Sequence, residues 1–149
     1  MAAYFRLVQA RWAGAAMSGE GARLAGGRWN PPGVPAVYLA GSRALAALEV
    51  LVHAPRELLA VEWRMIEVQV EEDEIDAAAD LPDDWRDLPS SPGARRFGGN
   101  WLRSARQLAL RLPSTIIPQE AILLMNPRHE AAAGLVISEP EWFRFDPRI

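Results

Sequence analysis

The order of the apolar segments along the chain constrains its fold more than any other feature of the sequence. Seven segments have the apolar pattern of short strands, and two have helical periodicity. The predicted strands cover 4–8, 34–40, 61–70, 115–117, 121–125, 135–138 and 142–145, and the predicted helices cover 43–54 and 100–111. Since strands outnumber helices and do not alternate with them regularly, this order predicts an α+β fold rather than a doubly wound parallel sheet. We expect the 149 residues to form one domain, residues 1–149.

Local signals refine these elements. Ser42 stands at the N-cap position of the first predicted helix, and Pro55 follows its end. In the predicted strand 61–70, the apolar alternation slips by one residue, which predicts a β-bulge. Two long stretches are expected to be mostly loop, the glycine- and alanine-rich segment 13–33 and the acidic segment 71–92.

The composition excludes several kinds of chemistry. With no cysteine, the chain can form no disulfide, zinc–thiolate site, iron–sulfur cluster or cysteine nucleophile. All 16 basic residues are arginine, so Schiff-base chemistry and a phosphate-loop lysine are absent. His53 and His129 are the two histidines, too few for a histidine-rich metal site, and we expect no metal. A net charge of −3 disfavours sequence-independent binding to nucleic acid.

The sequence shows no sign of a membrane association. No apolar run approaches the roughly 18 residues that cross a bilayer. The first residues also lack a basic region followed by an apolar stretch, so no signal peptide is expected. We therefore expect a cytoplasmic protein.

Glu49 is the most informative single residue. In the first predicted helix, Leu45, Leu48 and Val52 form an apolar stripe, and Glu49 falls about 40° from Leu45 and about 60° from Val52. The helix is apolar on other sides too, so we expect it to be buried. A carboxylate there must be hydrogen-bonded or paired. Glu49 has either a catalytic role or a structural one. In the structural alternative, an arginine pairs with the carboxylate or His53 assists it.

Arg28 closes the glycine-rich segment, within the run from Gly26 to Gly33. The amides of a glycine turn beside a permanently charged guanidinium suit a phosphate or diphosphate. The spacing matches neither known phosphate-loop motif, so an ordinary irregular connection is the alternative. Trp29 is expected to anchor this loop in the core.

Four further residues are candidates for the same site. Tyr38 has small neighbours on its strand face, and it is either a ligand platform or a core tyrosine with a capped hydroxyl. Ser114 lacks a histidine partner, so it suits a hydrogen-bond donor rather than a nucleophile. Arg6 is either a second anion ligand or the partner of Glu49. Asn126 precedes a proline, which is typical of a structural turn.

Together these residues resemble the RES-domain toxins. The resemblance is carried by the continuous run from Gly26 to Ala40, by Leu48 to His53, and by three short segments. These segments are Phe5-Arg6-Leu7, Leu112-Pro113-Ser114 and Met125-Asn126-Pro127. The arginine, glutamate and serine for which that family is named match Arg28, Glu49 and Ser114, and the resemblance extends from Tyr4 to about Phe145.

The resemblance implies a fold, an activity and a partner. The implied fold is a split, mixed or antiparallel sheet with a cleft that binds NAD, similar to ADP-ribosyltransferases of the diphtheria-toxin type. The implied activity is cleavage of NAD by hydrolysis or phosphorolysis, or else transfer of ADP-ribose to a protein. The implied partner is an antitoxin with an Xre-like helix-turn-helix domain that covers the cleft, and a homodimer is a further possibility.

The chemistry of this reaction agrees with the residues available. Nicotinamide leaves as a neutral molecule, so one carboxylate suffices where an ordinary glycosidase needs two. In this interpretation Glu49 stabilises the positively charged ribose and Ser114 orients Glu49 or the nicotinamide amide. Tyr38 packs against the nicotinamide ribose or ring, Arg28 and Arg6 bind the diphosphate, and Asn126 is a further substrate-binding residue. The alternative from another class is a non-catalytic module that binds a nucleotide or a protein partner.

Overall fold

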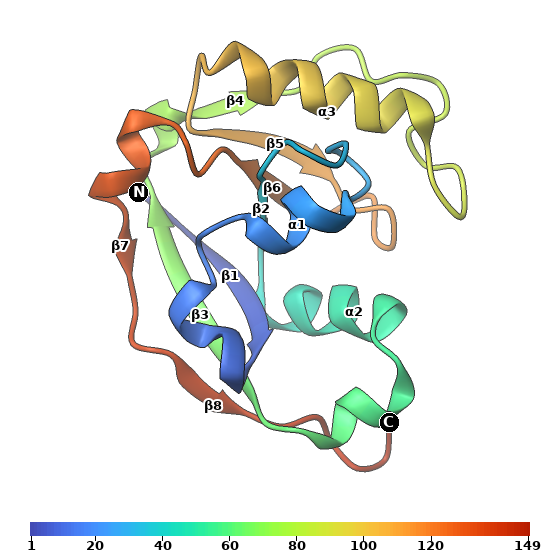
Figure 1. Cartoon of the computed structure of the whole chain (residues 1–149), viewed down its shortest axis with the longest axis vertical. Helices are drawn as coiled ribbons and strands as arrows, with labels where there is room; N and C mark the ends of the chain where they lie inside the picture. The colour runs from blue at the N-terminus through green and yellow to red at the C-terminus, as the bar shows by residue number, and fades with distance from the viewer.

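The computed structural model describes all residues, 1–149, and has the α+β architecture that the order of segments predicts. Figure 1 shows one curled sheet with its helices on the concave side and around its rim. The eight strands are β1 Ala2–Gln9, β2 Val37–Ala40, β3 Trp63–Val70, β4 Ile75–Ala77, β5 Ala109–Pro113, β6 Ala121–Met125, β7 Val136–Ile137 and β8 Glu141–Phe143. The three α-helices are α1 Glu20–Ala25, α2 Arg43–His53 and α3 Pro92–Ser104. Four 3-10 helices are η1 Ala10–Ala15, η2 Arg56–Ala60, η3 Glu72–Glu74 and η4 Glu130–Gly134.

The sheet is mixed and forms a half-barrel. Its strand order is β4-β5-β6-β2-β1-β3-β7, and β8 also pairs with β3. The β4–β5 pair is parallel, whereas the other pairs are antiparallel. The β1–β2 junction is the weakest one, because a single pair, Phe5 with Ala40, joins the two strands. The sheet is therefore split at its middle, between two well-paired halves.

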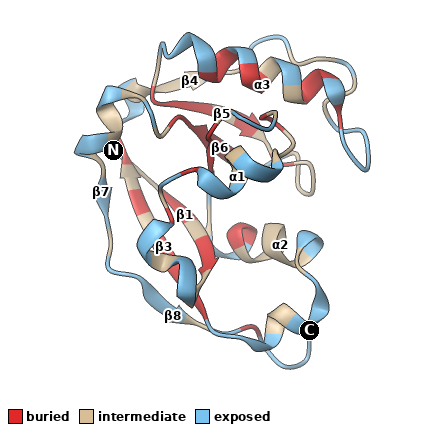
Figure 2. Ribbon diagram, viewed as in Figure 1, coloured by how far each residue is buried: buried red, intermediate tan, exposed pale blue.

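Both faces of the sheet are covered, and this corrects the predicted bulge. In β3, Trp63 and Met65 belong to the core cluster on one face, whereas Ile66, Val68 and Val70 belong to the cluster on the other face. The β1–β3 register runs without interruption from Ala2↔Val70 to Gln9↔Trp63. The apolar pattern slips because the buried face changes along the strand, and no residue is inserted. Figure 2 shows the buried centre of these strands.

The predicted helix 100–111 is wrong at both ends. Helix α3 begins at Pro92, with Ser91 as N-cap, and it ends where Ala105 takes a left-handed conformation with φ 52°. Leu108, Leu110 and Leu112 then lie in or beside β5, where their two-residue spacing fits a strand.

Of the other predicted elements, one strand is wrong and the remaining strands are found with different bounds. The predicted strand 115–117 is wrong, because these residues form the turn between β5 and β6. The strands expected at 4–8, 34–40, 61–70, 121–125, 135–138 and 142–145 each overlap with an observed strand, although most of the bounds differ. The segment 13–33 was expected to be a loop, but it includes α1, and the segment 71–92 includes η3 and β4.

Helix α2 is capped as its sequence predicts, but it is less buried. The Ser42 hydroxyl accepts a hydrogen bond from the Leu45 amide at 3.0 Å. Leu45 and Ala46 are buried, whereas Val52 is 54% exposed. The inward face of α2 is thus rotated away from the predicted stripe, and Glu49 lies at its half-buried side. None of the helices is both long and apolar enough to span a bilayer.

Candidate active site

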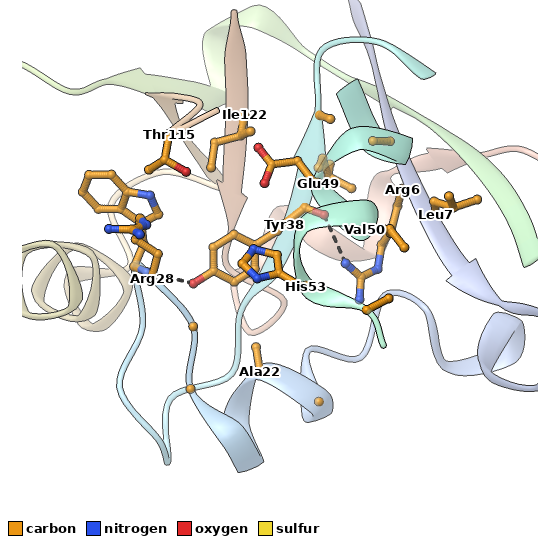
Figure 3. A pocket seen from close by; sticks show the side chains of 18 of the residues that line it. Arg6, Leu7, Ala22, Arg28, Tyr38, Glu49, Val50, His53, Thr115 and Ile122 are labelled. Atoms are coloured by element: carbon orange, nitrogen blue, oxygen red, sulfur yellow. Dashed lines mark hydrogen bonds between the residues drawn. The ribbon is translucent and has the colours of Figure 1, made fainter. Parts of the chain in front are cut away.

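The split in the sheet borders a cavity of about 700 Å³. Its walls come from β1, from the glycine-rich segment before β2, from β2 itself, from α2 and from the start of α3. The volume lies in the range of small-molecule and cofactor sites. Its charged or polar lining residues include Arg6, Arg28, Tyr38, Glu49 and Arg95. Figure 3 shows Glu49 between Tyr38 and Ile122, with Arg28 and Arg6 on opposite sides of Tyr38.

Ser114 orients the Glu49 carboxylate. The Ser114 Oγ donates to Glu49 Oε1 at 3.0 Å and accepts from the amides of Ile116 and Ile117, both at 3.1 Å. A serine hydroxyl has one proton and two lone pairs. Since two backbone amides occupy the lone pairs, the proton must point at Glu49. Ser114 is fully buried, so this direction is fixed by the turn between β5 and β6.

Glu49 has no cationic partner. No arginine or histidine lies within salt-bridge distance of its carboxylate, so the structural alternatives, pairing with Arg6 or aid from His53, are not found. The hydroxyl of Ser114 is its one side-chain hydrogen-bond donor, and it engages Oε1. The second carboxylate oxygen, Oε2, therefore remains available to a ligand in the cavity. Such a carboxylate can stabilise positive charge that develops beside it.

Tyr38 has a capped hydroxyl and a ring in the cavity wall. The hydroxyl donates to Asn30 Oδ1 at 2.5 Å and accepts from the Trp29 amide at 3.1 Å. Burial raises the pKa of Tyr38 well above its usual range, and the nearby charges of Arg95 and Arg28 oppose that rise. The hydroxyl is therefore neutral and committed to the glycine-rich segment, so the ring is the part of Tyr38 that a ligand meets.

The loop from Gly26 to Gly33 is ordered by Asn30. The Asn30 side chain is fully buried, and its amide donates to the carbonyls of Ala22 and Val34, both at 2.9 Å. A Cβ on Gly27 would lie 2.7 Å from the Tyr38 hydroxyl and 2.8 Å from Asn30 Oδ1. Only glycine allows the loop to pass this close to the network.

Trp29 anchors the loop in the core, as its sequence position predicts. The residue is fully buried, and its ring stacks on Trp85 at 6.4 Å and meets the Phe97 edge at 6.0 Å. Gly98 of α3 makes this approach possible, because a Cβ there would lie 1.9 Å from the Trp29 carbonyl oxygen. Gly98 is not among the residues predicted for the site, although a glycine pair inside a helix is a signal of close packing.

The two arginines expected to bind an anion occupy different surroundings. Arg28 Nη1 donates to the carbonyls of Trp85 at 3.0 Å and Asp87 at 2.8 Å. Arg6 donates through Nε to Ala16 O at 2.8 Å and through Nη1 to Tyr38 O at 3.1 Å. Burial lowers the pKa of Arg6 from its usual value to about 10, so its side chain stays charged at neutral pH. Neither arginine has an acidic partner.

Asn126 lies away from the cavity. It follows β6 and is buried, and its side-chain amide donates to the Leu102 carbonyl at 3.1 Å while its Oδ1 accepts from the Arg128 amide at 3.0 Å. These bonds tie the turn after β6 to the end of α3, which is the structural alternative raised for this residue. In contrast, Arg95 lines the cavity and is not among the residues predicted for the site. No group of three or more His, Asp or Glu side chains is arranged to hold a metal ion.

The fold and the site define a class of protein: an α+β half-barrel whose cavity holds one serine-bound carboxylate among unpaired arginines. The chain belongs to the RES domain family, whose model matches residues 3–146. The resemblance inferred from the segments around Arg28, Glu49 and Ser114 is thereby confirmed.

Several relatives match most of the chain. A protein named Toxin Res from Yersinia enterocolitica is 38% identical over 148 residues, which is 97% of each chain. The Prs ADP-ribosylating toxin of a Sphingobium species is 38% identical over 138 residues, 89% of this chain and 86% of that protein. A shorter match joins this chain to the NAD(+) phosphorylase MbcT of Mycobacterium bovis, 61% identical over 36 residues, 24% of this chain and 19% of that protein.

Proposed function

We propose that this protein is a toxin that consumes NAD by cleaving the bond between nicotinamide and ribose. The observation that carries the proposal is the Glu49 carboxylate, oriented by Ser114 and free of any cation in a cavity lined by unpaired arginines. The names of two relatives support it, since one is an NAD(+) phosphorylase and another an ADP-ribosylating toxin. The family resemblance to diphtheria-toxin-type ADP-ribosyltransferases is part of the same proposal.

In the proposed reaction, the bond from the pyridinium nitrogen to the ribose C1′ breaks, and its electron pair goes to the nitrogen. Nicotinamide leaves neutral, so no general acid is needed, and the ribose becomes an oxocarbenium-like cation. Glu49 stabilises this cation, directly or through the 2′-hydroxyl, and Ser114 keeps the carboxylate in place. The Tyr38 ring packs against the nicotinamide end.

The diphosphate that joins the two nucleosides of NAD is its anionic part, and we assign its binding to arginine. Arg28 binds the diphosphate, because a guanidinium fork matches two phosphate oxygens. Arg6 as a second diphosphate ligand and Asn126 as a substrate-binding residue stay predictions; Arg6 lines the cavity, whereas Asn126 does not. The acceptor that attacks C1′ is water, phosphate or a nucleophile on a protein, and each gives a different product.

Purified protein should release nicotinamide from NAD, and Glu49→Gln should lower kcat about 100- to 1,000-fold. The estimate follows the loss of one preorganised group that stabilises a charged transition state. Glu57→Gln is the matched control, because Glu57 is exposed in η2 and does not line the cavity. Equal turnover by a folded Glu49→Gln protein would refute the assignment.

A second function, ADP-ribosylation of a protein, is favoured by the Sphingobium relative of that name. The products separate the two. Free ADP-ribose indicates hydrolysis, ADP-ribose 1″-phosphate that appears only with added phosphate indicates phosphorolysis, and label from radioactive NAD in a protein band indicates transfer. We also propose an antitoxin with a helix-turn-helix domain as partner, which should abolish nicotinamide release by covering the cavity.

A further inference from the structure

Arg95 is a cavity-lining cation that has no assigned task. It lies in the first turn of α3, on the side of the helix that faces the glycine-rich segment, and it is half-buried. Its Nε donates to the Gly27 carbonyl at a long 3.4 Å, and its two terminal nitrogens have no hydrogen-bond partner in the protein. No carboxylate lies within 4.0 Å of it. A half-buried guanidinium without an anion is costly unless a ligand supplies one.

Arg28 approaches the same part of the cavity from the loop. Only its Nη1 is engaged, by two carbonyls of the segment 85–87, so Nε and Nη2 remain free. The charges of both arginines act on the Tyr38 hydroxyl, where they oppose the effect of burial on its pKa. Two like charges directed at one region repel each other, and an anion between them removes that repulsion.

The neighbour of Arg95 shows that this placement is specific. Arg96 is exposed and does not line the cavity, although it belongs to the same turn of α3. Arg6 lies on the other side of Tyr38 in Figure 3, and its Nε and Nη1 already donate to carbonyls. Arg28 and Arg95 are therefore the pair that can grip one anion together.

We propose that Arg95 is a substrate-binding residue, which with Arg28 clamps the diphosphate of the dinucleotide from both sides. This assignment rests on the proposed function, because it takes NAD as the substrate. Each guanidinium offers parallel N–H donors to phosphate oxygens, so the clamp holds the ADP-ribose part while Glu49 acts at C1′. Since the diphosphate does not change during the reaction, the clamp contributes to binding in the ground state and the transition state alike.

The test compares Arg95→Ala with Arg96→Ala in steady-state assays of nicotinamide release. Arg95→Ala should raise the KM for NAD about tenfold or more and change kcat less than threefold, because uniform binding is lost. The inhibition constant of ADP-ribose should rise by the same factor, and that of nicotinamide should not change. Arg96→Ala should match the wild type in all four constants.

Two further measurements keep the outcome decisive. If Arg95→Ala is misfolded by circular dichroism, Arg95→Gln replaces it, since glutamine keeps a donor to the Gly27 carbonyl without the charge. A purely structural role would disturb the loop beside Tyr38 and weaken nicotinamide as well as ADP-ribose, and this result would overturn the proposal. Unchanged constants for NAD and ADP-ribose would also overturn it.

Failure of the clamp can be told from failure of the proposed function. If the wild type releases no nicotinamide, the proposed function fails, yet calorimetric titration with ADP-ribose still tests the clamp. Binding that is about tenfold weaker in Arg95→Ala supports it. Equal binding, or none by the wild type, overturns it.

Discussion

Arg6 and Arg28 both line the cavity without an acidic partner, but the protein holds them in different regions. Arg6 donates to two carbonyls of the folded core. One belongs to Tyr38 in β2, and the other to Ala16, which is buried in the second core cluster with Ile66 and Val68 of β3. The carbonyls that Arg28 engages belong to the segment 85–87, where Asp87 is exposed. Both arginines are half-buried as whole residues, and the Arg6 guanidinium is buried deeply enough to lower its pKa.

The difference indicates which arginine is part of the fold. The β1–β2 ladder consists of one residue pair, and Arg6 supplies a hydrogen bond to the Tyr38 carbonyl across the split next to that pair. The side chain of Arg6 therefore supplies a hydrogen bond between β1 and β2 where the backbone pairing of these strands is missing. Arg28 instead ties a loop to another loop and keeps two nitrogens free. We infer that the split region depends on Arg6 for stability, whereas the loop region uses Arg28 for binding and depends on α3 for its position.

Gly98→Ala should give the largest effect and would show how far the loop region depends on α3. The new Cβ would lie 1.9 Å from the Trp29 carbonyl oxygen, a backbone atom that cannot turn aside. The helix or the loop must move, at a cost of about 3 kcal/mol in the free energy of unfolding. Urea denaturation measures this loss, and nicotinamide release should fall with it because Arg28 moves with Trp29.

Gly14→Ala is the control for that substitution, because nothing lies within 4 Å of a Cβ at Gly14. Its unfolding free energy should stay within about 0.5 kcal/mol of the wild type. A Gly98→Ala protein that is as stable as the Gly14→Ala protein would mean that the loop does not rest on α3.

Arg6→Ala should cost about 2 kcal/mol of unfolding free energy, because the part-buried carbonyl acceptors of Ala16 and Tyr38 lose a charged donor. Arg28→Ala should cost less than about 1 kcal/mol, since its acceptors lie on a partly exposed segment that water can reach. Urea denaturation of the two variants in parallel tests the comparison directly. If Arg28→Ala is the more destabilised protein, the division into a fold arginine and a binding arginine is wrong.

The pH dependence of the stability lost in Arg6→Ala tests whether the buried Arg6 side chain is charged. Burial lowers the pKa of Arg6 to about 10, so the folded protein releases this proton more readily than the unfolded chain. The penalty for burying the charge is therefore present at every pH below about 10, and it is relieved only above that value. The difference between Arg6→Ala and the wild type should be the same at pH 6, 7.5 and 9.

The residues that the sequence could place are those whose chemistry is local or whose pattern is long. The Ser42 cap and the end of α2 before Pro55 follow from neighbouring residues, and the meeting of Glu49 with Ser114 followed from the family resemblance. The end of α3 could not be predicted, because Ala105 takes a left-handed conformation without a glycine to signal it. Arg95 could not be predicted either, because its place in the cavity depends on the packing of the glycine-rich loop against α3.

The sequence also could not predict which face of α2 is buried. Leu45, Leu48 and Val52 make a regular stripe, but the concave side of the half-barrel receives Leu45 and Ala46 and leaves Val52 exposed. The curvature of the sheet decides this rotation, and curvature depends on pairing between strands far apart in the chain. Periodicity therefore located Glu49 near the boundary without fixing its partner.

Tyr38→Phe should have a small effect on turnover and would separate the role of the ring from that of the hydroxyl. Loss of the hydroxyl leaves the Trp29 amide and Asn30 Oδ1 without a partner, which should cost about 1 kcal/mol of unfolding free energy. The ring that faces the cavity is kept, so kcat for nicotinamide release should fall less than about tenfold, whereas Tyr38→Ala should lose far more. Because the hydroxyl is neutral and engaged within the loop, it has no proton to give to the reaction. A loss of kcat in Tyr38→Phe as large as that in Glu49→Gln would contradict this, and it would move Tyr38 from the binding wall to the chemistry.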